Sequence, residues 1–406
     1  MPSVGDVVEL LTRLISIDTT TADPDRGYAN RGDYRRAIDE LLSYCREHRL
    51  EARYIDLGDS RVGIKPHLLV KAGDRGLKLL LLTHFDTVPA DVREWSTPPF
   101  EAKASGGRIY GRGAADNKGA LAACLTALSE LASESLENTI VLLAACDEEC
   151  GGPYGVSRVA EMLAEGELGV KPDLCWVVDA YSEYIAVGAS GSIILKVEVE
   201  GKGGHSAYPY KALNPIYPLA QVALEVEKWG RELEERELSE HPCAEGYAVV
   251  PARASATVLV ANPSMAGNII PERGVLKLNL RVPPGLDMRR LELEAIRRIT
   301  SVVGNRWSSY RAKVEVEEAF KPYYTDLSRS REAAWLASLL REGKPELQCA
   351  VELASNDGCY FSWLPVICYG CIRRDCNIHA PDEFVYVEDL ERLKEAVKKA
   401  ALTEFR

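Results

Sequence analysis

The sequence predicts an α/β protein that carries a second, α+β domain as an insertion. Residues 1–188 alternate helical patterns with short apolar runs, which is the signature of βαβ units and a mostly parallel sheet. Beyond Gly188 the strand-like segments alternate apolar and charged residues, as antiparallel strands with one solvated face do. From about Phe320 the first pattern returns. We therefore expect a discontinuous domain at 1–188 and 320–406, interrupted by an inserted domain at 189–319.

The first domain is expected to consist of buried strands separated by helices. Uninterrupted apolar runs of this length are typical of strands buried on both faces. The strands are predicted at residues 79–82, 139–146 and 174–178, and the helices at 7–15, at 120–131 and from residue 387 onward.

The inserted domain is expected to be a four-stranded antiparallel sheet with two helices. Its strands alternate apolar with charged residues, so one face is buried and the other is solvated. The predicted strands are residues 193–200, 255–260, 275–282 and 313–317, and the helices lie at 215–233 and 288–303.

Histidines and acids stand where the apolar runs of the first domain end. One run ends in His84, the next in Asp147-Glu148-Glu149 and the third in Asp179, while two polar loops add Asp116 and His379. Open α/β sheets bind ligands at the carboxyl ends of their strands. Imidazole together with carboxylate suits zinc, and manganese or cobalt less selectively. We therefore predict a metal site at this edge of the sheet.

Asp86 is predicted to orient the first of these histidines. It lies two residues after His84, so in an extended chain both side chains point the same way. A carboxylate can hold one imidazole nitrogen by a hydrogen bond and leave the other nitrogen for a metal.

Composition narrows the class of protein. The net charge of −12 argues against a nucleic-acid surface, and no apolar stretch approaches the length of a membrane span. The N-terminus lacks the basic start and apolar core of a signal peptide, which favours a cytoplasmic location. Gln221 and Gln348 are the only glutamines, and scarce thermolabile amides indicate a thermophile.

Eleven cysteines are many for a cytoplasmic chain. Cys368-x-x-Cys371 has no second Cys-x-x-Cys partner, so a structural zinc knuckle is disfavoured. If the source is a thermophile, intracellular disulfides are possible. Two pairs are then candidates, Cys146 with Cys150 and Cys371 with Cys376.

The order and spacing of these motifs resemble the M20 metallopeptidases, which include acetylornithine deacetylase, succinyl-diaminopimelate desuccinylase, aminoacylase and carboxypeptidases. The resemblance runs from about Val4 to about Leu393. It rests on His-x-Asp-x-Val-Pro from His84, Gly-Arg-Gly-x-x-Asp-x-Lys-Gly from Gly111, Asp-Glu-Glu from Asp147, Gly-x-x-x-His-Ser from Gly201 and His-x-x-x-Glu from His379. It implies a zinc-peptidase-like catalytic domain and an inserted lid and dimerisation domain.

The resemblance also implies roles for single residues of the catalytic domain. Asp116 would bridge two divalent ions, most simply zinc, with a cis peptide bond between Asp116 and Asn117. His84 and Asp179 would complete one ion's protein ligands, and Glu149 and His379 those of the other. Asp86 would orient His84, and Glu148 would be the general base that takes a proton from water.

In the inserted domain the resemblance singles out three further residues. His205 would cross the interface of a homodimer and stabilise the developing oxyanion in the partner's active site. Asn268 and Arg281 match positions that contact substrate, and Arg281 can hold a carboxylate in a bidentate fork. Closure of this domain would exclude water and align His205 with Arg281.

The expected activity is hydrolysis of an amide bond in an N-acyl amino acid or short peptide with a free carboxylate. A deacylase of the acetylornithine or succinyl-diaminopimelate type is favoured over a carboxypeptidase or dipeptidase. One departure affects the substrate, because acyl-amino acid enzymes often carry an arginine where this chain has Cys359; Arg373 or Arg374 are candidate substitutes.

Two rival classes are less well supported. A metal-free binding module would lack a ligand, and no ligand position is lost. A dinucleotide-binding oxidoreductase, suggested by Gly111-Arg112-Gly113, would need a third glycine and a later ribose-binding acid.

Overall fold

The computed structural model describes residues 4–21, 32–59, 63–150, 155–262 and 266–406. Its contacts divide the chain into two compact units. Unit 1 comprises residues 1–187, 325–349 and 360–406, and unit 2 comprises 188–324 and 350–359. Residues 188, 320–324 and 350–359, which sequence patterns assign to the first domain, therefore cluster with unit 2. The predicted division into a catalytic and a lid domain stays a prediction about function.

The described part of the chain contains a nine-stranded mixed sheet in the order β1-β2-β6-β3-β7-β19-β8-β17, with β18 paired to β8. Its four central strands, β6, β3, β7 and β19, are parallel, and the flanking pairs β1–β2, β2–β6 and β19–β8 are antiparallel. The boundary between the units falls within β8 and β18. The strands are β1 (Glu51–Asp56), β2 (Pro66–Ala72), β3 (Lys78–His84), β6 (Thr139–Ala145), β7 (Leu174–Val177), β8 (Ile185–Ala189), β17 (Tyr323–Tyr324), β18 (Cys349–Glu352) and β19 (Val366–Cys368).

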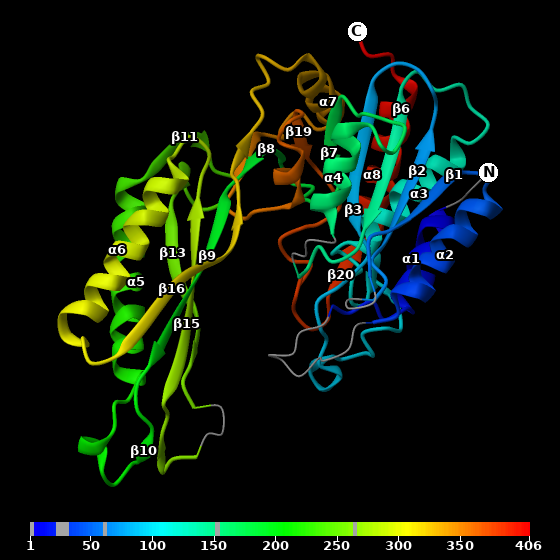
Figure 1. The fold of residues 1–406 in the computed structure, drawn as a ribbon. Coiled ribbons are helices and arrows are strands. Elements are labelled where there is room, and N and C mark those ends of the chain that lie inside the picture. Colours follow the sequence, from blue (N-terminus) through cyan, green and yellow to red (C-terminus); the bar gives the residue numbers. More distant parts are fainter. Residues whose placement is uncertain (1–3, 22–31, 60–62, 151–154, 263–265) are drawn as a thin grey trace. The chain divides into compact units, whose positions relative to one another are not determined.

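Helices cover both faces of this sheet (Figure 1). One face packs on a single apolar cluster that receives side chains from α1, α2, α3, α7 and α8, and Figure 1 draws α4 on the other face. A small sheet of β4, β5 and β20 completes unit 1. These elements are α1 (Val4–Ile15), α2 (Tyr34–Glu47), α3 (Lys118–Glu130), α4 (Val156–Glu165), α7 (Arg331–Arg341), α8 (Val387–Leu402), η2 (Val92–Glu94), β4 (Lys103–Ser105), β5 (Arg108–Tyr110) and β20 (Phe384–Tyr386).

Helix α3 is buried nearly all round, because small side chains let it approach its neighbours closely. Between Lys118 and Leu128 all its residues are buried. Gly119 has no room for a larger residue, since an added Cβ would lie 2.2 Å from the carbonyl oxygen of Ala114. This close packing fixes the loop that precedes α3, which carries Asp116.

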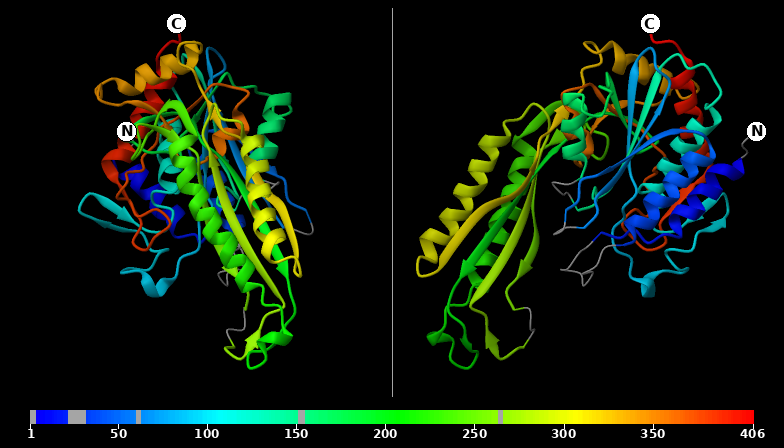
Figure 2. Two further views of the ribbon diagram at one scale, coloured as in Figure 1. Left: turned by 90° about the vertical axis from the view of Figure 1, so that its left-hand side faces the viewer. Right: turned by 45° about the vertical axis from the view of Figure 1, so that its right-hand side comes forward.

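Unit 2 is built on a four-stranded antiparallel sheet in the order β13-β15-β9-β16. Alternate residues of β9 and β15 are buried against α5 and α6, which lie on one face of the sheet in both views of Figure 2. The other face carries charged and polar side chains. The elements are β9 (Gly191–Glu200), β10 (Gly204–His205), η3 (Pro209–Lys211), α5 (Ile216–Arg236), β11 (Leu238–Pro242), β12 (Val249–Pro251), β13 (Arg253–Val260), β14 (Ile269–Ile270), β15 (Arg273–Val282), α6 (Met288–Arg306), β16 (Arg311–Phe320) and η4 (Asp357–Phe361), whose last two residues fall in unit 1.

The predicted fold class is confirmed: a mixed α/β unit with a mostly parallel core is accompanied by a separate four-stranded antiparallel sheet. Each predicted strand and helix has an observed counterpart, and α8 begins at Val387 as expected. The antiparallel strands β1 and β2 were not predicted. They join the sheet through pairing with β6, which local sequence does not reveal.

Candidate metal centre

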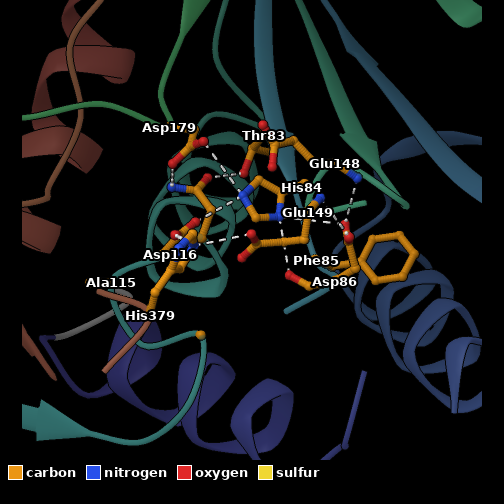
Figure 3. A network of polar contacts seen from close by, with 12 residues as sticks. Thr83, His84, Phe85, Asp86, Ala115, Asp116, Glu148, Glu149, Asp179 and His379 are labelled. Carbon is orange, nitrogen blue, oxygen red and sulfur yellow. Dashed lines mark hydrogen bonds and ion pairs between the residues drawn. The ribbon is translucent and has the colours of Figure 1, made fainter. Parts of the chain in front are cut away.

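The five residues predicted to bind metal converge at one edge of the main sheet of unit 1 (Figure 3). His84 is the last residue of β3, Glu149 follows β6 and Asp179 follows β7. Asp116 lies in the loop before α3, and His379 lies between β19 and β20. Parallel strands end at the same edge, so residues far apart in sequence meet there.

Among the described residues, these side chains form two groups suited to a metal ion. In the first group His84 Nε2 lies 3.0 Å from Asp116 Oδ1 and 3.5 Å from Asp179 Oδ2. In the second group His379 Nε2 lies 2.9 Å from Asp116 Oδ2 and 3.1 Å from Glu149 Oε2. Each carboxylate oxygen of Asp116 thus faces a different group. The peptide bond between Asp116 and Asn117 is cis, as predicted.

The groups hold more negative than positive charge. Hydrogen bonds with Asp116 and Glu149 raise the pKa of His379 to about 11. Burial would lower the pKa of His84, but hydrogen bonds with Asp116, Asp179 and Asp86 raise it well above its usual value. Burial, followed by repulsion from Asp116, raises the pKa of Glu149 to about 7. The carboxylates therefore draw protons onto the histidines, as they would draw other cations.

The donor set fits divalent ions. It offers imidazole nitrogens and carboxylate oxygens, the ligands of zinc and related metals. Within the described chain the buried Glu149 Oε1 accepts no hydrogen bond, although its partner oxygen contacts His379. Buried polar atoms are nearly always satisfied, so an oxygen left in this way favours an additional ligand such as a cation.

Asp86 connects the histidine of the first group to the loop that carries Glu149. His84 Nδ1 lies 3.1 Å from the Asp86 carbonyl oxygen and 3.5 Å from its Oδ1. The Asp86 carboxylate also accepts hydrogen bonds from the backbone N–H groups of Glu148, at 3.2 Å, and Glu149, at 3.1 Å. Asp86 is fully buried, so this one side chain orients both parts of the site.

Glu148 lies beside the two groups without belonging to either (Figure 3). It is partly exposed, whereas the preceding Asp147 is buried with a φ of +63°. Asp147 forms an ion pair with Lys65 and accepts a hydrogen bond of 3.0 Å from Tyr34 Oη. These contacts anchor the turn that carries Glu148 and Glu149.

Sequence patterns missed two residues that hold the metal-site loops. Both Glu383 oxygens accept hydrogen bonds from the Asp116 loop, from Arg112 Nη1 at 2.7 Å and from the N–H groups of Gly113, Ala115 and Asp116 at 2.9–3.1 Å. Asn117 Nδ2 donates to Asp179 Oδ1 at 2.9 Å. The motif His-x-x-x-Glu contained Glu383, but nothing local indicated that it would reach a loop some 270 residues away.

The three residues singled out in the inserted domain lie in unit 2, where His205 and Asn268 are neighbours and Arg281 lies apart from them. His205 is exposed in β10, which pairs with β14, and the Asn268 carbonyl accepts a hydrogen bond of 3.0 Å from Ser206 N. Arg281 stands near the other end of β15, where Nη1 donates to Ser355 Oγ at 2.9 Å. Arg281 lies eight positions along β15 from Arg273, the first residue of that strand, which is roughly 26 Å.

The arginines considered as substitutes at position 359 are already paired with acids. Arg373 forms ion pairs with Glu388 and Asp389, and its guanidinium lies 4.0 Å from the Tyr386 ring centroid. Arg374 lies 3.8 Å from Glu183.

The structure shows all eleven cysteines as thiols, which is contrary to both candidate disulfides. Helix 118–130 and loop 370–376 instead bury several thiols, among them Cys124 and Cys371.

Comparison with known proteins identifies the family. The model of peptidase family M20/M25/M40 matches residues 80–403, so the chain belongs to this family. It is a hydrolase that acts on amide or peptide C–N bonds. Within the described ranges, no helix is long and apolar enough to cross a membrane.

Curated relatives and solved structures agree with this assignment. A succinyl-diaminopimelate desuccinylase from Xanthomonas euvesicatoria is 31% identical over 355 residues, covering 85% of this chain and 88% of the relative. One from Sulfurovum is 28% identical, covering 97% and 98%. The fold is similar to that of a di-peptidase from Saccharomyces cerevisiae (TM-score 0.78, 15% identity, covering 97% and 95%). It is also similar to that of an M20 family metallo-carboxypeptidase from Sulfolobus solfataricus (TM-score 0.74, 17% identity, covering 97% and 98%).

Proposed function

We propose that this chain is a two-metal amidohydrolase that cleaves the amide bond of an N-acyl amino acid. The observation that carries the proposal is the pair of His–carboxylate groups that share Asp116, one carboxylate oxygen facing each group. Relatives named succinyl-diaminopimelate desuccinylase at about 30% identity support the deacylase reading. A carboxypeptidase or dipeptidase is the second candidate, because solved proteins of similar fold carry those names.

In this proposal Asp116 bridges two divalent ions, most simply zinc, with cobalt or manganese as substitutes. His84 and Asp179 hold one ion, and Glu149 and His379 hold the other. When bound, such ions supply Lewis-acid chemistry, since they lower the pKa of water and polarise the scissile carbonyl.

Glu148 acts in the proposal as the general base and then as the general acid. It takes a proton from the attacking water and gives it to the leaving amine, a role that requires a carboxylate beside the ligands but not among them. The ion pair of Lys65 with Asp147 and the hydrogen bond from Glu148 N to Asp86 fix the backbone from which the Glu148 side chain extends, which supports this role. Asp86 contributes by orienting His84.

Residues 189–319, which make up most of unit 2, are proposed to be the lid and dimerisation domain, and Asn268 and Arg281 to contact substrate. His205 lies in the small sheet of β10 and β14, which follows one end of β9, and Arg281 lies near the far end of β15, so one small substrate cannot contact both in a single chain. This separation favours His205 acting in the site of a partner subunit. The edge strand β13 offers a surface for pairing, because Val258, Leu259 and Val260 are 39–49% exposed on it.

Activity measured over acylated amino acids and dipeptides, with added zinc, cobalt or manganese, tests the proposal. Wild-type protein should release the acyl group and bind about two ions per chain, as a two-metal site requires. Glu148→Gln should lower kcat by about 10² to 10⁴ and leave the metal content unchanged, since the base is lost and the ligands remain. Lost metal in that variant would make Glu148 a ligand. Absence of bound metal in wild type under metal-replete conditions would support a binding module.

Mixing two inactive variants tests the dimer. His205→Ala should keep its metal and lose turnover. If His205 serves the partner's site, mixing it with Glu148→Gln should restore activity, since half of the sites in a mixed dimer then have both groups. No recovery, in a mixture shown by light scattering to contain dimers, would contradict the role across subunits.

The proposal also includes a cytoplasmic location and a thermophilic source, the latter testable by the melting temperature.

A further inference from the structure

Two arginines face each other on the open side of the sheet in unit 2. Arg253 of β13 and Arg281 of β15 are direct partners in the antiparallel register. Their neighbours Ala252, Leu280 and Val282 are buried in the cluster beneath α5 and α6. Because side chains alternate along a strand, both guanidinium groups lie on the face away from the helices. Side chains in this relation have Cβ atoms about 5 Å apart.

This pair differs from the other cations on the same face. Lys277 lies 2.8 Å from Glu317, Lys196 lies 3.9 Å from both Glu198 and Glu315, and Arg273 also pairs with Glu198. Among the described residues, no acid forms an ion pair with Arg253 or Arg281. Like charges directly opposite each other destabilise a sheet, so the fold does not account for the pair.

The immediate surroundings of the two arginines are polar but neutral. Ser192 is the register partner of Arg281 on β9, and its hydroxyl donates to Asn279 Oδ1 at 3.2 Å. Ser355 Oγ accepts from Arg281 and donates to the Ser190 carbonyl at 2.7 Å, which holds the guanidinium in place. Burial, and after it the charge of Arg253, lowers the pKa of Arg281. No counter-charge comes from these groups.

Arg253 also has a donor that the described chain does not use. Its Nε is buried and has no hydrogen-bond partner there. Together with a terminal nitrogen, Nε forms the fork that binds a carboxylate through two parallel hydrogen bonds. Arg281 spends one terminal nitrogen on Ser355 and keeps donors for a second carboxylate.

We propose that Arg253 and Arg281 form one binding site for a ligand with two carboxylate groups, one for each guanidinium, and that this ligand is the acidic part of the substrate. That this ligand is part of the substrate rests on the proposed function. Arg253 then sets specificity, because a ligand with one carboxylate leaves one guanidinium without a counter-charge. The substrate class becomes N-acyl amino acids with at least two carboxylates.

The test compares two probes of equal length on the metal-loaded full chain, succinate with two carboxylates and butyrate with one. Calorimetry should show that wild type binds succinate more tightly than butyrate. Arg253→Gln should weaken succinate binding about tenfold or more and leave butyrate binding unchanged, because only the second carboxylate loses its fork. Arg253→Lys keeps the charge without the fork and should bind succinate with intermediate affinity.

Arg273→Gln is the matched control, since Arg273 lies on the same strand and face but already pairs with Glu198. It should bind both probes as wild type does. Wild-type succinate affinity in both Arg253 variants, or equal losses for both probes, would overturn the proposal. Metal content and circular dichroism establish that each variant is folded.

These measurements separate the inference from the proposed function, because they need no turnover. Succinate binding that depends on Arg253, in a chain that hydrolyses no acylated amino acid, would refute the proposed function and leave the arginine site standing. Hydrolysis of acylated amino acids, together with succinate binding that does not depend on Arg253, would overturn the arginine site and leave the proposed function standing.

Discussion

Each of the two units contains a cluster of charged side chains whose charge is not neutralised by neighbouring residues. The excess charge is negative in unit 1 and positive in unit 2. In unit 1 three carboxylates, Asp116, Glu149 and Asp179, surround two histidines. In unit 2 Arg253 faces Arg281, and no described acid pairs with either. Folding alone disfavours both arrangements, since unpaired or like charges cost stability when they are removed from water. Such clusters are therefore best explained by ligands, cations in unit 1 and an anion in unit 2.

The clusters also differ in how they are held. The acids and histidines of unit 1 are fixed by other side chains and by backbone donors, with Asp86 and Glu383 each bonded to more than one part of the site. The arginines of unit 2 are positioned mainly by strand register, with Ser355 as the one described side chain bonded to Arg281. Metal coordination needs tightly defined ligand positions, whereas a flexible guanidinium can adjust to its carboxylate.

The largest expected effect comes from Asp116→Asn, which should abolish activity and lower the metal content to near zero. An amide cannot replace the shared charge at the centre of both groups. Succinate binding that depends on Arg253 should persist, since it belongs to the other unit. Elemental analysis and calorimetry check the two parts separately. Retention of both ions in Asp116→Asn would contradict the bridging role.

A second effect concerns protons. In the metal-free chain both histidines have raised pKa values, about 11 for His379, so near neutral pH both carry protons that a metal must displace. Binding of two ions should release about two protons, one from each histidine, so the apparent affinity for each ion should rise about tenfold per pH unit. Below pH 7 Glu149 also becomes protonated, because its pKa is raised to about 7, so metal binding then displaces a further proton. Calorimetry in buffers of different ionisation enthalpy measures the release. Metal binding without release of protons would contradict the assignment of His84 and His379 as ligands.

The third effect is smaller and concerns Glu383. Glu383→Gln removes the charge that holds the Asp116 loop, and should reduce metal affinity or kcat about 10- to 100-fold, as loss of a group that orients ligands does. Glu388→Gln, an exposed acid five residues further on, is the control and should behave as wild type. Wild-type metal affinity and turnover in Glu383→Gln would show that packing around α3 positions the loop without Glu383.

Much of the metal centre follows from local pattern. An apolar run indicates the length and the end of a buried strand, so the positions of His84, Glu149 and Asp179 at strand ends could be predicted from the sequence. Asp116 and His379 stood out as an acid and a histidine in polar loops, and the family motifs added the roles of all five residues. The contacts of Glu383 and Lys65 were not readable, because hydrogen bonds and ion pairs between distant segments leave no periodic signal.

The arginine pair could not be predicted from local sequence. Alternation along β13 and β15 tells which face each arginine takes, but a register between strands that are 28 positions apart decides that Arg253 meets Arg281. The distance between His205 and Arg281 is also set by the tertiary structure, because the length of β15 separates them. The sequence alone led us to expect that domain closure aligns these two residues. Chain periodicity thus specifies elements and their buried faces, whereas long-range packing selects the partners, because register depends on the whole sheet and on no single segment.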